Sequence, residues 1–200
     1  MSSHYIIRED QEPALFIADL EAVEYHVIES LLEWAPHVLI TEGAIPMMLE
    51  KGIKTDALFV ENGSLNWKSL LAYQWPVKIF ELSLFPNNLI GYLKDKNITE
   101  LNIIHSFSNY RKEYLDQLIS SFRTVAFYCG CLKYQFSRNG RFEKWISPGR
   151  RLLIPNYRKE DFWISETIVE IEDGRFEVVR EGIVTVRSKQ DFWIAEAVLC

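Results

Sequence analysis

Two glutamates in this sequence stand where acids could hold a phosphate-bearing ligand through a metal ion. Glu42 follows the short apolar run 37–40, and Glu61 follows a second apolar run, 57–60. Between the runs, apolar residues recur at helical spacing, so the order is strand, helix, strand. That order is typical of a crossover between parallel strands, whose carboxyl ends form ligand sites in open α/β sheets. We therefore predict that both glutamates face a ligand; for Glu42 the alternative is a solvated carboxylate on a loop.

Metal-assisted binding is the chemistry that these acids would supply. The sequence holds neither a G-x-G-x-x-G nor a G-x-x-x-x-G-K phosphate loop, so acids would hold a phosphate through Mg²⁺ rather than a glycine cradle holding it directly. Ser64 is predicted to cap a helix first and to contact phosphate second. The four histidines are scattered, and no Ser/His/Asp or Cys/His order predicts nucleophilic catalysis. His105 ends a predicted strand on the same edge and is a weaker candidate.

Strands and helices alternate along the first 130 residues. Apolar runs predict the strands, and helical periodicity predicts the segments between them. The alternation predicts an α/β fold with a Rossmann-like, mostly parallel sheet and flanking helices, because parallel neighbours need crossover connections. The predicted strands are 14–18, 37–40, 57–60, 77–82, 101–104 and 124–128, and the predicted helices are 22–34, 45–52, 64–71, 88–94 and 110–122.

The pattern changes after residue 131. Short strand-like runs separated by glycine and proline turns predict a smaller antiparallel β-sandwich domain. Asp173-Gly174 between two alternating runs predicts a hairpin. We therefore divide the chain into an α/β domain, 1–130, and an antiparallel β domain, 131–200. The basic residues between 138 and 151 are interpreted as a charged hairpin, with a phosphate contact as the alternative.

A near-repeat places two tryptophans in equivalent positions of the β domain. The sequence EDFWISE at 160–166 recurs as QDFWIAE at 190–196. One interpretation is two equivalent strands of a sandwich, each with an aromatic pair packed against the core and the partner sheet. The other is that Trp163 or Trp193 forms an aromatic wall for a ring of a bound ligand.

Composition excludes several classes of protein. The 200 residues are 48% hydrophobic with a net charge of −6, and an acidic chain lacks the basic face that nucleic-acid binding needs. No apolar run is long enough to cross a membrane, and the start lacks the order of a signal peptide, so we expect a cytoplasmic protein. The three cysteines are expected to be reduced thiols, because they fit neither a disulfide framework nor a zinc site.

The central segment resembles thiamine pyrophosphokinases. That family carries an Asp-Gly-(Gly/Ala)-Ala-Asn turn, a Gly-Ile-Lys-Pro-Asp segment and a Gly-Asp-x-Asp-Ser motif, and a β-sandwich follows its α/β domain. Here the corresponding stretches are EGAIP at 42–46, GIKTD at 52–56 and VENGS at 60–64, in the same register without gaps. The resemblance is specific over 14–65 and architectural beyond it.

The resemblance implies transfer of pyrophosphate from ATP to the hydroxyl of thiamine, giving thiamine diphosphate and AMP, with Mg²⁺ as cofactor. By matched position it makes Glu61 the catalytic and metal-binding acid, and it assigns ATP contacts to Glu42, Gly43, Ser64 and Asn88. Other expected acids are replaced: Gly63 cannot bind a metal through a side chain, and amides and a lysine occupy the later positions. Because two Mg²⁺ ions and a triphosphate need several anionic oxygens, we expect the activity to be weak or lost. Acids that could replace the missing ones are Glu81, Asp95 and Asp116.

Two further implications concern partners. The resemblance implies a homodimer, with each active site between the α/β domain of one subunit and the β domain of the other. The alternatives to an enzyme are a non-catalytic relative that binds a nucleotide or a thiamine compound, or pairs with a true kinase, and a protein-protein module with an empty pocket. An enzyme would bind ATP far better with Mg²⁺, whereas a metal-free pocket would be indifferent to a chelator.

Overall fold

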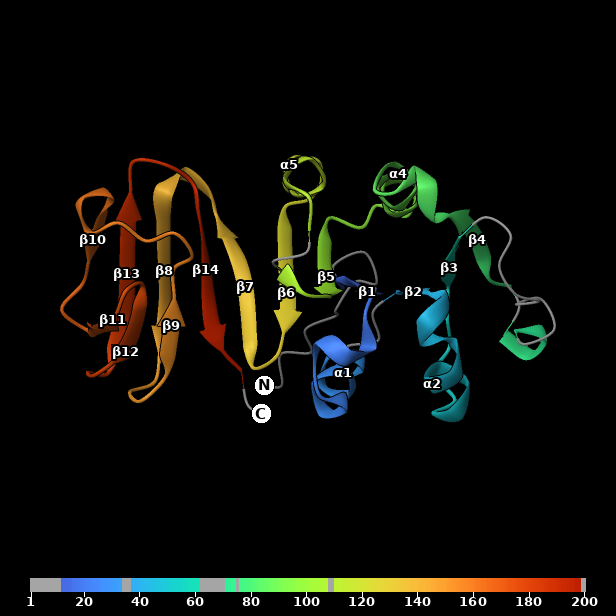
Figure 1. The fold of residues 1–200 in the computed structure, drawn as a ribbon, viewed down its shortest axis with the longest axis horizontal. Coiled ribbons are helices and arrows are strands. Elements are labelled where there is room, and N and C mark those ends of the chain that lie inside the picture. The colour runs from blue at the N-terminus through green and yellow to red at the C-terminus, as the bar shows by residue number, and fades with distance from the viewer. Residues whose placement is uncertain (1–11, 34–36, 62–70, 75, 108–109, 199–200) are drawn as a thin grey trace, which may run out of the picture. The chain divides into compact units, whose positions relative to one another are not determined.

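The chain consists of two compact units, Met1–Gly130 and Cys131–Cys200 (Figure 1). The structure is a computed structural model that describes residues 12–33, 37–61, 71–74, 76–107 and 110–198. The first unit is mixed α/β with a parallel sheet, and the second is antiparallel β. The predicted change from a mostly parallel sheet to antiparallel strands is confirmed.

The sheet of the first unit is parallel throughout and has the strand order β6-β5-β1-β2-β3-β4. From β1 the chain builds outward through β2, β3 and β4. It then returns to the other side of β1 to add β5 and β6, so the strand order reverses beside β1. The strands are β1 (Ala14–Ile17), β2 (Val38–Thr41), β3 (Ala57–Val60), β4 (Lys78–Glu81), β5 (Glu100–Ile104) and β6 (Thr124–Cys129).

Helices cover both faces of this sheet. In Figure 1, α1 (Tyr25–Leu32) and α2 (Ile45–Glu50) lie on one face, whereas α4 (Asn87–Asp95) and α5 (Lys112–Ser121) lie on the other. A change of face together with a change in building direction is what right-handed crossovers produce. The predicted helix 64–71 falls almost entirely outside the described residues.

Burial on both faces explains why the central strands are continuous apolar runs. All four residues of β1 are buried, and so are the first three residues of β2 and of β3. A strand covered by helices on both sides needs an apolar residue at every position rather than alternation. Core formation in this unit therefore depends on these short runs.

Local capping sets two helix boundaries. The sequence predicted a helix from residue 22, but α1 begins at Tyr25, because Asp19 caps a short 3-10 turn, Leu20–Ala22, and Val23 is extended. The predicted end of α2 at Gly52 is confirmed. Gly52 has a φ of +65°, and the Ile53 N–H donates to the Met48 carbonyl at 2.9 Å, which is the hydrogen bonding of a glycine-terminated helix.

The second unit contains two groups of antiparallel strands, in the orders β11-β12-β9-β14-β7 and β10-β13-β8. The predicted hairpin at Asp173-Gly174 joins β11 to β12, and Gly174 has a φ of +70°. The strands are β7 (Leu132–Ser137), β8 (Arg141–Ile146), β9 (Arg151–Leu153), β10 (Phe162–Ile164), β11 (Ile168–Glu172), β12 (Arg175–Val178), β13 (Gly182–Ser188) and β14 (Phe192–Ala197).

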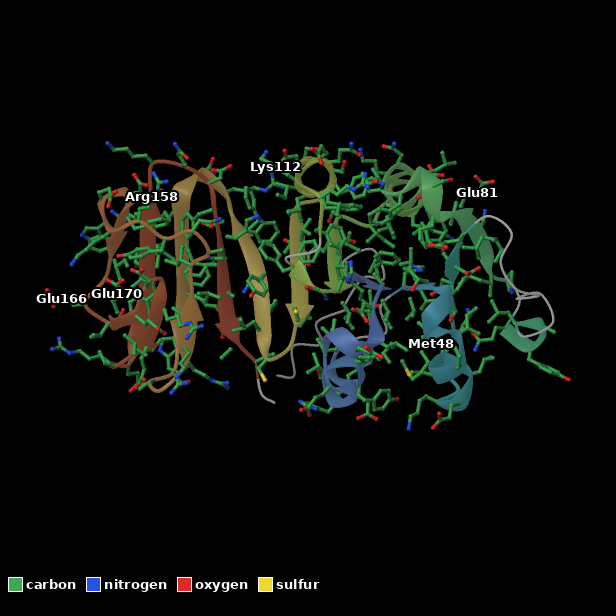
Figure 2. The ribbon with its side chains drawn as sticks, viewed as in Figure 1. Met48, Glu81, Lys112, Arg158, Glu166 and Glu170 are labelled. Atoms are coloured by element: carbon green, nitrogen blue, oxygen red, sulfur yellow. The ribbon has the colours of Figure 1, made fainter. Side chains whose placement is uncertain are left out.

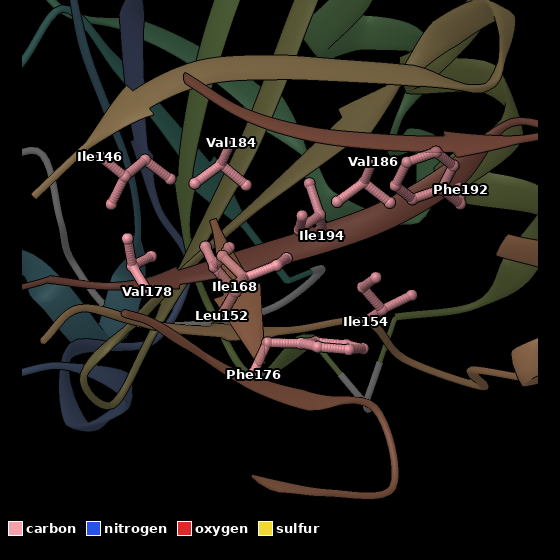
Figure 3. Packing of buried hydrophobic residues seen from close by; sticks show 10 residues of the cluster. All are labelled: Ile146, Leu152, Ile154, Ile168, Phe176, Val178, Val184, Val186, Phe192 and Ile194. Atoms are coloured by element: carbon pink, nitrogen blue, oxygen red, sulfur yellow. The ribbon is translucent and has the colours of Figure 1, made fainter. Parts of the chain in front are cut away.

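One hydrophobic cluster draws residues from both strand groups (Figure 3). Val184 and Val186 come from β13, and Leu152, Phe176 and Ile194 come from the larger group. All five are buried to within a few per cent. This shared cluster is the core of the second unit.

Two smaller findings concern cysteines and membranes. Cys131 is disulfide-bonded, so the expectation of three reduced thiols is wrong at this position; Cys129 is a free thiol.

No helix within the described ranges is long and apolar enough to cross a bilayer.

Candidate functional site

Acidic residues line up at the carboxyl edge of β2, β3 and β4. Parallel pairing sets Thr41 beside Phe59 and Val60 beside Glu81. Glu42 therefore follows the end of β2, Glu61 follows the end of β3, and Glu81 ends β4 (Figure 2 labels Glu81). The structure brings both predicted acids to one sheet edge.

The surroundings of these acids differ. Glu42 begins a 3-10 turn and is half-buried, whereas Glu61 and Gly43 are exposed. Glu81 accepts a hydrogen bond from the Ser83 hydroxyl at 3.3 Å. Within the described ranges, no three His, Cys, Asp or Glu side chains are arranged to hold a metal ion. Ser64, the other predicted contact, lies outside the described residues.

The side chain of Asn88 is engaged by its own neighbourhood. Its amide nitrogen donates to the Glu81 carbonyl at 2.5 Å, and its amide oxygen accepts from the Leu89 N–H at 2.8 Å. The first of these bonds ties the first turn of α4 to the end of β4. An ATP contact through this amide would have to compete with them.

Of the three acids named as replacements, Glu81 alone lies on the carboxyl edge. Asp95 is the last residue of α4 and is exposed. Asp116 lies on α5 and forms an ion pair with Lys112 at 2.7 Å. The helix positions of Asp95 and Asp116 leave Glu81 as the candidate to act with Glu42 and Glu61.

A cavity of about 320 Å³ opens beside these acids, in the first unit. Its residues come from the ends of β1, β2 and β5, from the connection between β4 and α4, and from the start of α5. Four of them are aromatic, and two are basic. The lining residues are Phe16, Ala18, Thr41, Leu82, Phe85, His105, Tyr110, Arg111 and Tyr114.

The cavity coincides with the reversal of strand order. Ala18 follows β1 and His105 follows β5, the two neighbours between which the building direction changes. Helical connections leave in opposite directions from such a pair, and the crevice outside the carboxyl ends is where ligands bind in open α/β sheets. The topology thus opens a ligand-sized space at this position.

An aromatic cluster forms the walls of the cavity, with Phe85 at its centre. The Phe85 ring is stacked on Phe16, with centroids 5.5 Å apart. Tyr114 and Tyr110 meet it edge-on at 5.6 and 6.1 Å. Rings at such distances and angles form the favourable offset and edge-to-face pairs of aromatic side chains. A planar ligand would extend this arrangement.

His105 is held at the basic end of the cavity by residues that follow β1 and by Tyr110, which precedes α5. The N–H groups of Ala18 and Asp19 both donate to the Ile104 carbonyl, at 3.0 and 3.1 Å. This fixes the Asp19 carboxylate 3.9 Å from Nδ1 of His105. That nitrogen is buried and has no hydrogen-bond partner among the described residues. On another side, the Tyr110 ring lies 5.1 Å from the imidazole.

Burial controls the protonation of His105 and Tyr110. Desolvation lowers the pKa of His105, and the nearby Asp19 carboxylate opposes that change. Burial raises the pKa of the Tyr110 phenol well above its usual range. Both groups are therefore neutral at pH 7, and Arg111 carries the permanent positive charge of the lining.

We expect the pKa of the His105 imidazole to lie below its ordinary value near 6.5. Asp19→Asn should lower this pKa further, because it removes the negative charge that favours protonation. Because the unfolded chain then binds this proton more tightly than the folded chain, His105 lowers stability as pH falls through about 6.5, and the loss is complete below the folded pKa. NMR titration of the imidazole Cε1 proton measures the midpoint, and His105→Gln assigns the resonance. A midpoint above 6.5, or one raised by Asp19→Asn, would contradict this expectation.

The two tryptophans of the near-repeat occupy different strand groups. Trp163 lies on β10, is 56% exposed, and has the Arg187 guanidinium 5.3 Å from its ring centroid. Trp193 lies on β14, is half-buried and meets Phe136 at 5.2 Å. The preceding residues, Phe162 and Phe192, face the core and contact each other at 5.1 Å. Within each repeat, phenylalanine points inward and tryptophan points outward.

Sequence reasoning missed most of the cavity. Phe85, Tyr110 and Tyr114 carry no motif, so nothing but the fold marks them as neighbours. Asp19 could have been found, because it follows the first predicted strand as Glu42 and Glu61 follow theirs. Arg111 lies beside Lys112, the lysine at one of the later motif positions, but sequence reasoning did not name it as a candidate.

Comparison with known structures identifies the fold. A thiamine pyrophosphokinase from Bacillus subtilis matches with a TM-score of 0.65 and 8% identity, over 94% of this chain and 100% of that one. A thiamin pyrophosphokinase family protein from Enterococcus faecalis gives 0.62 and 10%, over 94% and 100%. Thiamin pyrophosphokinase from Candida albicans gives 0.58 and 12%, over 96% and 90%.

The match extends over both units of the chain. The protein therefore has a thiamine pyrophosphokinase-like fold, as the resemblance of the central segment predicted. No family model matches the sequence, and no curated protein matches it either. At these identities the likeness establishes the fold alone.

Proposed function

We propose that this protein binds a small molecule with a planar aromatic ring in the cavity between the ends of β1 and β5, and that pyrophosphate transfer from ATP to thiamine is weak or lost. The observation that carries the proposal is the position of an aromatic-walled cavity at the reversal of strand order. Nucleotides and thiamine compounds both contain such a ring. Binding of one of them without turnover is the non-catalytic form of the same proposal.

The acid complement supports weak rather than strong catalysis. Glu61 keeps a charge at the first position of the family motif, but Gly63 offers no side-chain ligand at the second. Glu42 and Glu81 end neighbouring strands and could add two carboxylates for Mg²⁺. Among the described residues these three acids are not arranged as a ready-made metal site. If the chain is active, they would have to hold Mg²⁺ together with ATP, and the metal would neutralise charge on the transferred group.

We expect thiamine-dependent release of AMP from Mg·ATP to be weak or undetectable at high protein concentration. Glu61→Gln should reduce any such activity about 10-fold or more, because it removes an anionic metal ligand. A fall in Glu61→Gln also excludes a contaminating kinase, whose activity would not respond to the substitution. Glu50→Gln, an exposed change on α2, should leave the activity unaltered and so controls for the loss of one carboxylate. Thiamine-dependent AMP that Glu61→Gln does not lower would mean either a contaminant or that the acids have been placed wrongly.

Ligand binding itself is tested by melting the protein with ATP or thiamine, each with Mg²⁺ and with EDTA. A ligand present at about 100 times its dissociation constant stabilises by roughly 2.7 kcal/mol, which raises the melting temperature measurably. Stabilisation that survives EDTA would support a metal-free pocket. No stabilisation by any of these compounds would favour the protein-protein module instead.

The two units are proposed to be a Rossmann-like domain, 1–130, and a β-sandwich domain, 131–200, assembled as a homodimer. The strand order of the first and the shared core of the second support these assignments. Trp163 or Trp193 would then form an aromatic wall for a ring bound by the dimer. Light scattering on the purified protein determines the oligomeric state directly.

A further inference from the structure

We propose that Arg111 reads a single anionic group on the aromatic ligand directly, without a metal ion. The inference rests on the proposed function, since it names the class of ligand for the same cavity: a planar ring that carries one phosphate monoester. It differs from metal-mediated recognition, in which the acids at the ends of β2 to β4 would hold phosphate through Mg²⁺.

The charge of the lining supports an anionic ligand. Among the described residues that line the cavity, none is acidic and Arg111 is the permanently charged one. His105 can donate a hydrogen bond but is neutral at pH 7 because of its burial. The Asp19 carboxylate faces the imidazole rather than lining the cavity. A negative group entering the cavity therefore meets Arg111 and the neutral His105.

The Arg111 guanidinium is available for such a group. No carboxylate in the described part of the chain forms an ion pair with it; instead it lies 5.7 Å from the ring centroid of Tyr114. A guanidinium that stacks on an aromatic ring is held in place while its N–H groups stay free to bind two phosphate oxygens. Tyr114 in the cavity wall thus positions the Arg111 guanidinium, and no carboxylate of the described residues holds it in an ion pair.

The start of α5 adds to this polarity. Arg111 is the N-cap of α5 and makes no side-chain capping bond, and helix N-termini attract anions through their backbone amides. The acid of the first turn, Glu113, is exposed and does not line the cavity. The acids that follow β2 and β3 would repel an anion, which favours an orientation with the negative group near Arg111.

Lys112 offers a matched control. It lies one residue further along the same helix turn, carries the same charge and does not line the cavity (Figure 2). Its ammonium is paired with Asp116 at 2.7 Å. Lys112→Gln therefore removes one positive charge from the same region without touching the cavity, and Arg111→Gln removes one from the cavity itself.

The test is calorimetric titration of the whole chain, in EDTA at pH 7.5, with AMP against adenosine and with thiamine monophosphate against thiamine. For the ring that fits, we expect the phosphorylated compound to bind about tenfold more tightly than the neutral or unphosphorylated one, as a charge-assisted contact provides. Arg111→Gln should abolish that preference while the parent ring still binds. Arg111→Lys should keep part of it, and Lys112→Gln should keep all of it.

Three outcomes overturn the inference while the proposed function stands: equal binding with and without phosphate, a preference that persists in Arg111→Gln, or a preference that appears only with Mg²⁺. If none of the four compounds binds the unmodified protein with or without Mg²⁺, the proposed function fails and this inference fails with it. Melting of each variant without ligand checks that a lost preference does not come from unfolding.

Discussion

Replacing Ala18 with tryptophan is expected to weaken ligand binding by the protein severely. Ala18 is half-buried and lines the cavity at the end of β1, so a larger side chain there occupies the space that a ligand ring would take. We expect the affinity to fall on the order of 100-fold, equivalent to about 2.7 kcal/mol. Calorimetric titration with whichever nucleotide or thiamine compound binds the unmodified protein measures the loss.

Stability separates blocked binding from a damaged fold. The indole enters existing space beside aromatic walls, so the melting temperature should fall little; forced overpacking would cost about 1–3 kcal/mol. Ala72→Trp is the matched control, because Ala72 is exposed and lies outside the cavity. Undiminished binding by Ala18→Trp would show that the ligand site lies elsewhere.

Gly140→Ala is expected to destabilise the second unit by about 3 kcal/mol or more, the range of a strained backbone that must also move. Gly140 joins β7 to β8 with a φ of +61°, and an added Cβ would lie 2.1 Å from the Ser188 carbonyl oxygen. That oxygen belongs to the backbone of β13, so no side-chain rotation relieves the contact. Urea unfolding followed by circular dichroism measures the change.

A substitution at Gly149 separates the strain of a positive φ from the clash with neighbouring backbone. Gly149 also has a positive φ, +82°, but an added Cβ meets nothing within 4 Å. Gly149→Ala should therefore cost only the conformational strain, about 1 kcal/mol. The difference between the two variants is the contribution of the crowded backbone. Losses of similar size would show that Ser188 moves aside at little cost and that the crowded backbone contributes nothing to the difference.

The fold was predictable where burial leaves a simple pattern. The runs that became β2 and β3 are apolar at almost every position, and Gly52 has the positive φ that ends a helix. Strand β8 was not predicted, because it is an edge strand whose outward positions are charged or aromatic. Phe142 and Ile146 face the core. Lys144 lies between them on the same face, opposite Val184, and interrupts the alternating pattern.

The site was predictable only in its acids. Glu42 and Glu61 follow apolar strands, so strand direction brings them to one edge. The cavity depends on a different kind of information. Phe16, Phe85 and Tyr114 meet because β4 leads across the sheet to β5 and α5, and separations of 69 and 29 residues leave no local pattern. In a sequence, aromatic residues also predict core positions, and one face of each of these rings does pack against the core.

Phe85 belongs to the packed interior and to the cavity wall at once, with Phe59 6.4 Å away on one side and Tyr114 5.6 Å away on the other. A ligand ring bound against Phe85 would pack as closely as an interior side chain does, rather than resting on the surface. Ligand choice should then obey the rules of interior substitution. Isosteric rings would be tolerated and an added methyl group penalised, because close-packed interiors respond to changes of a single methylene.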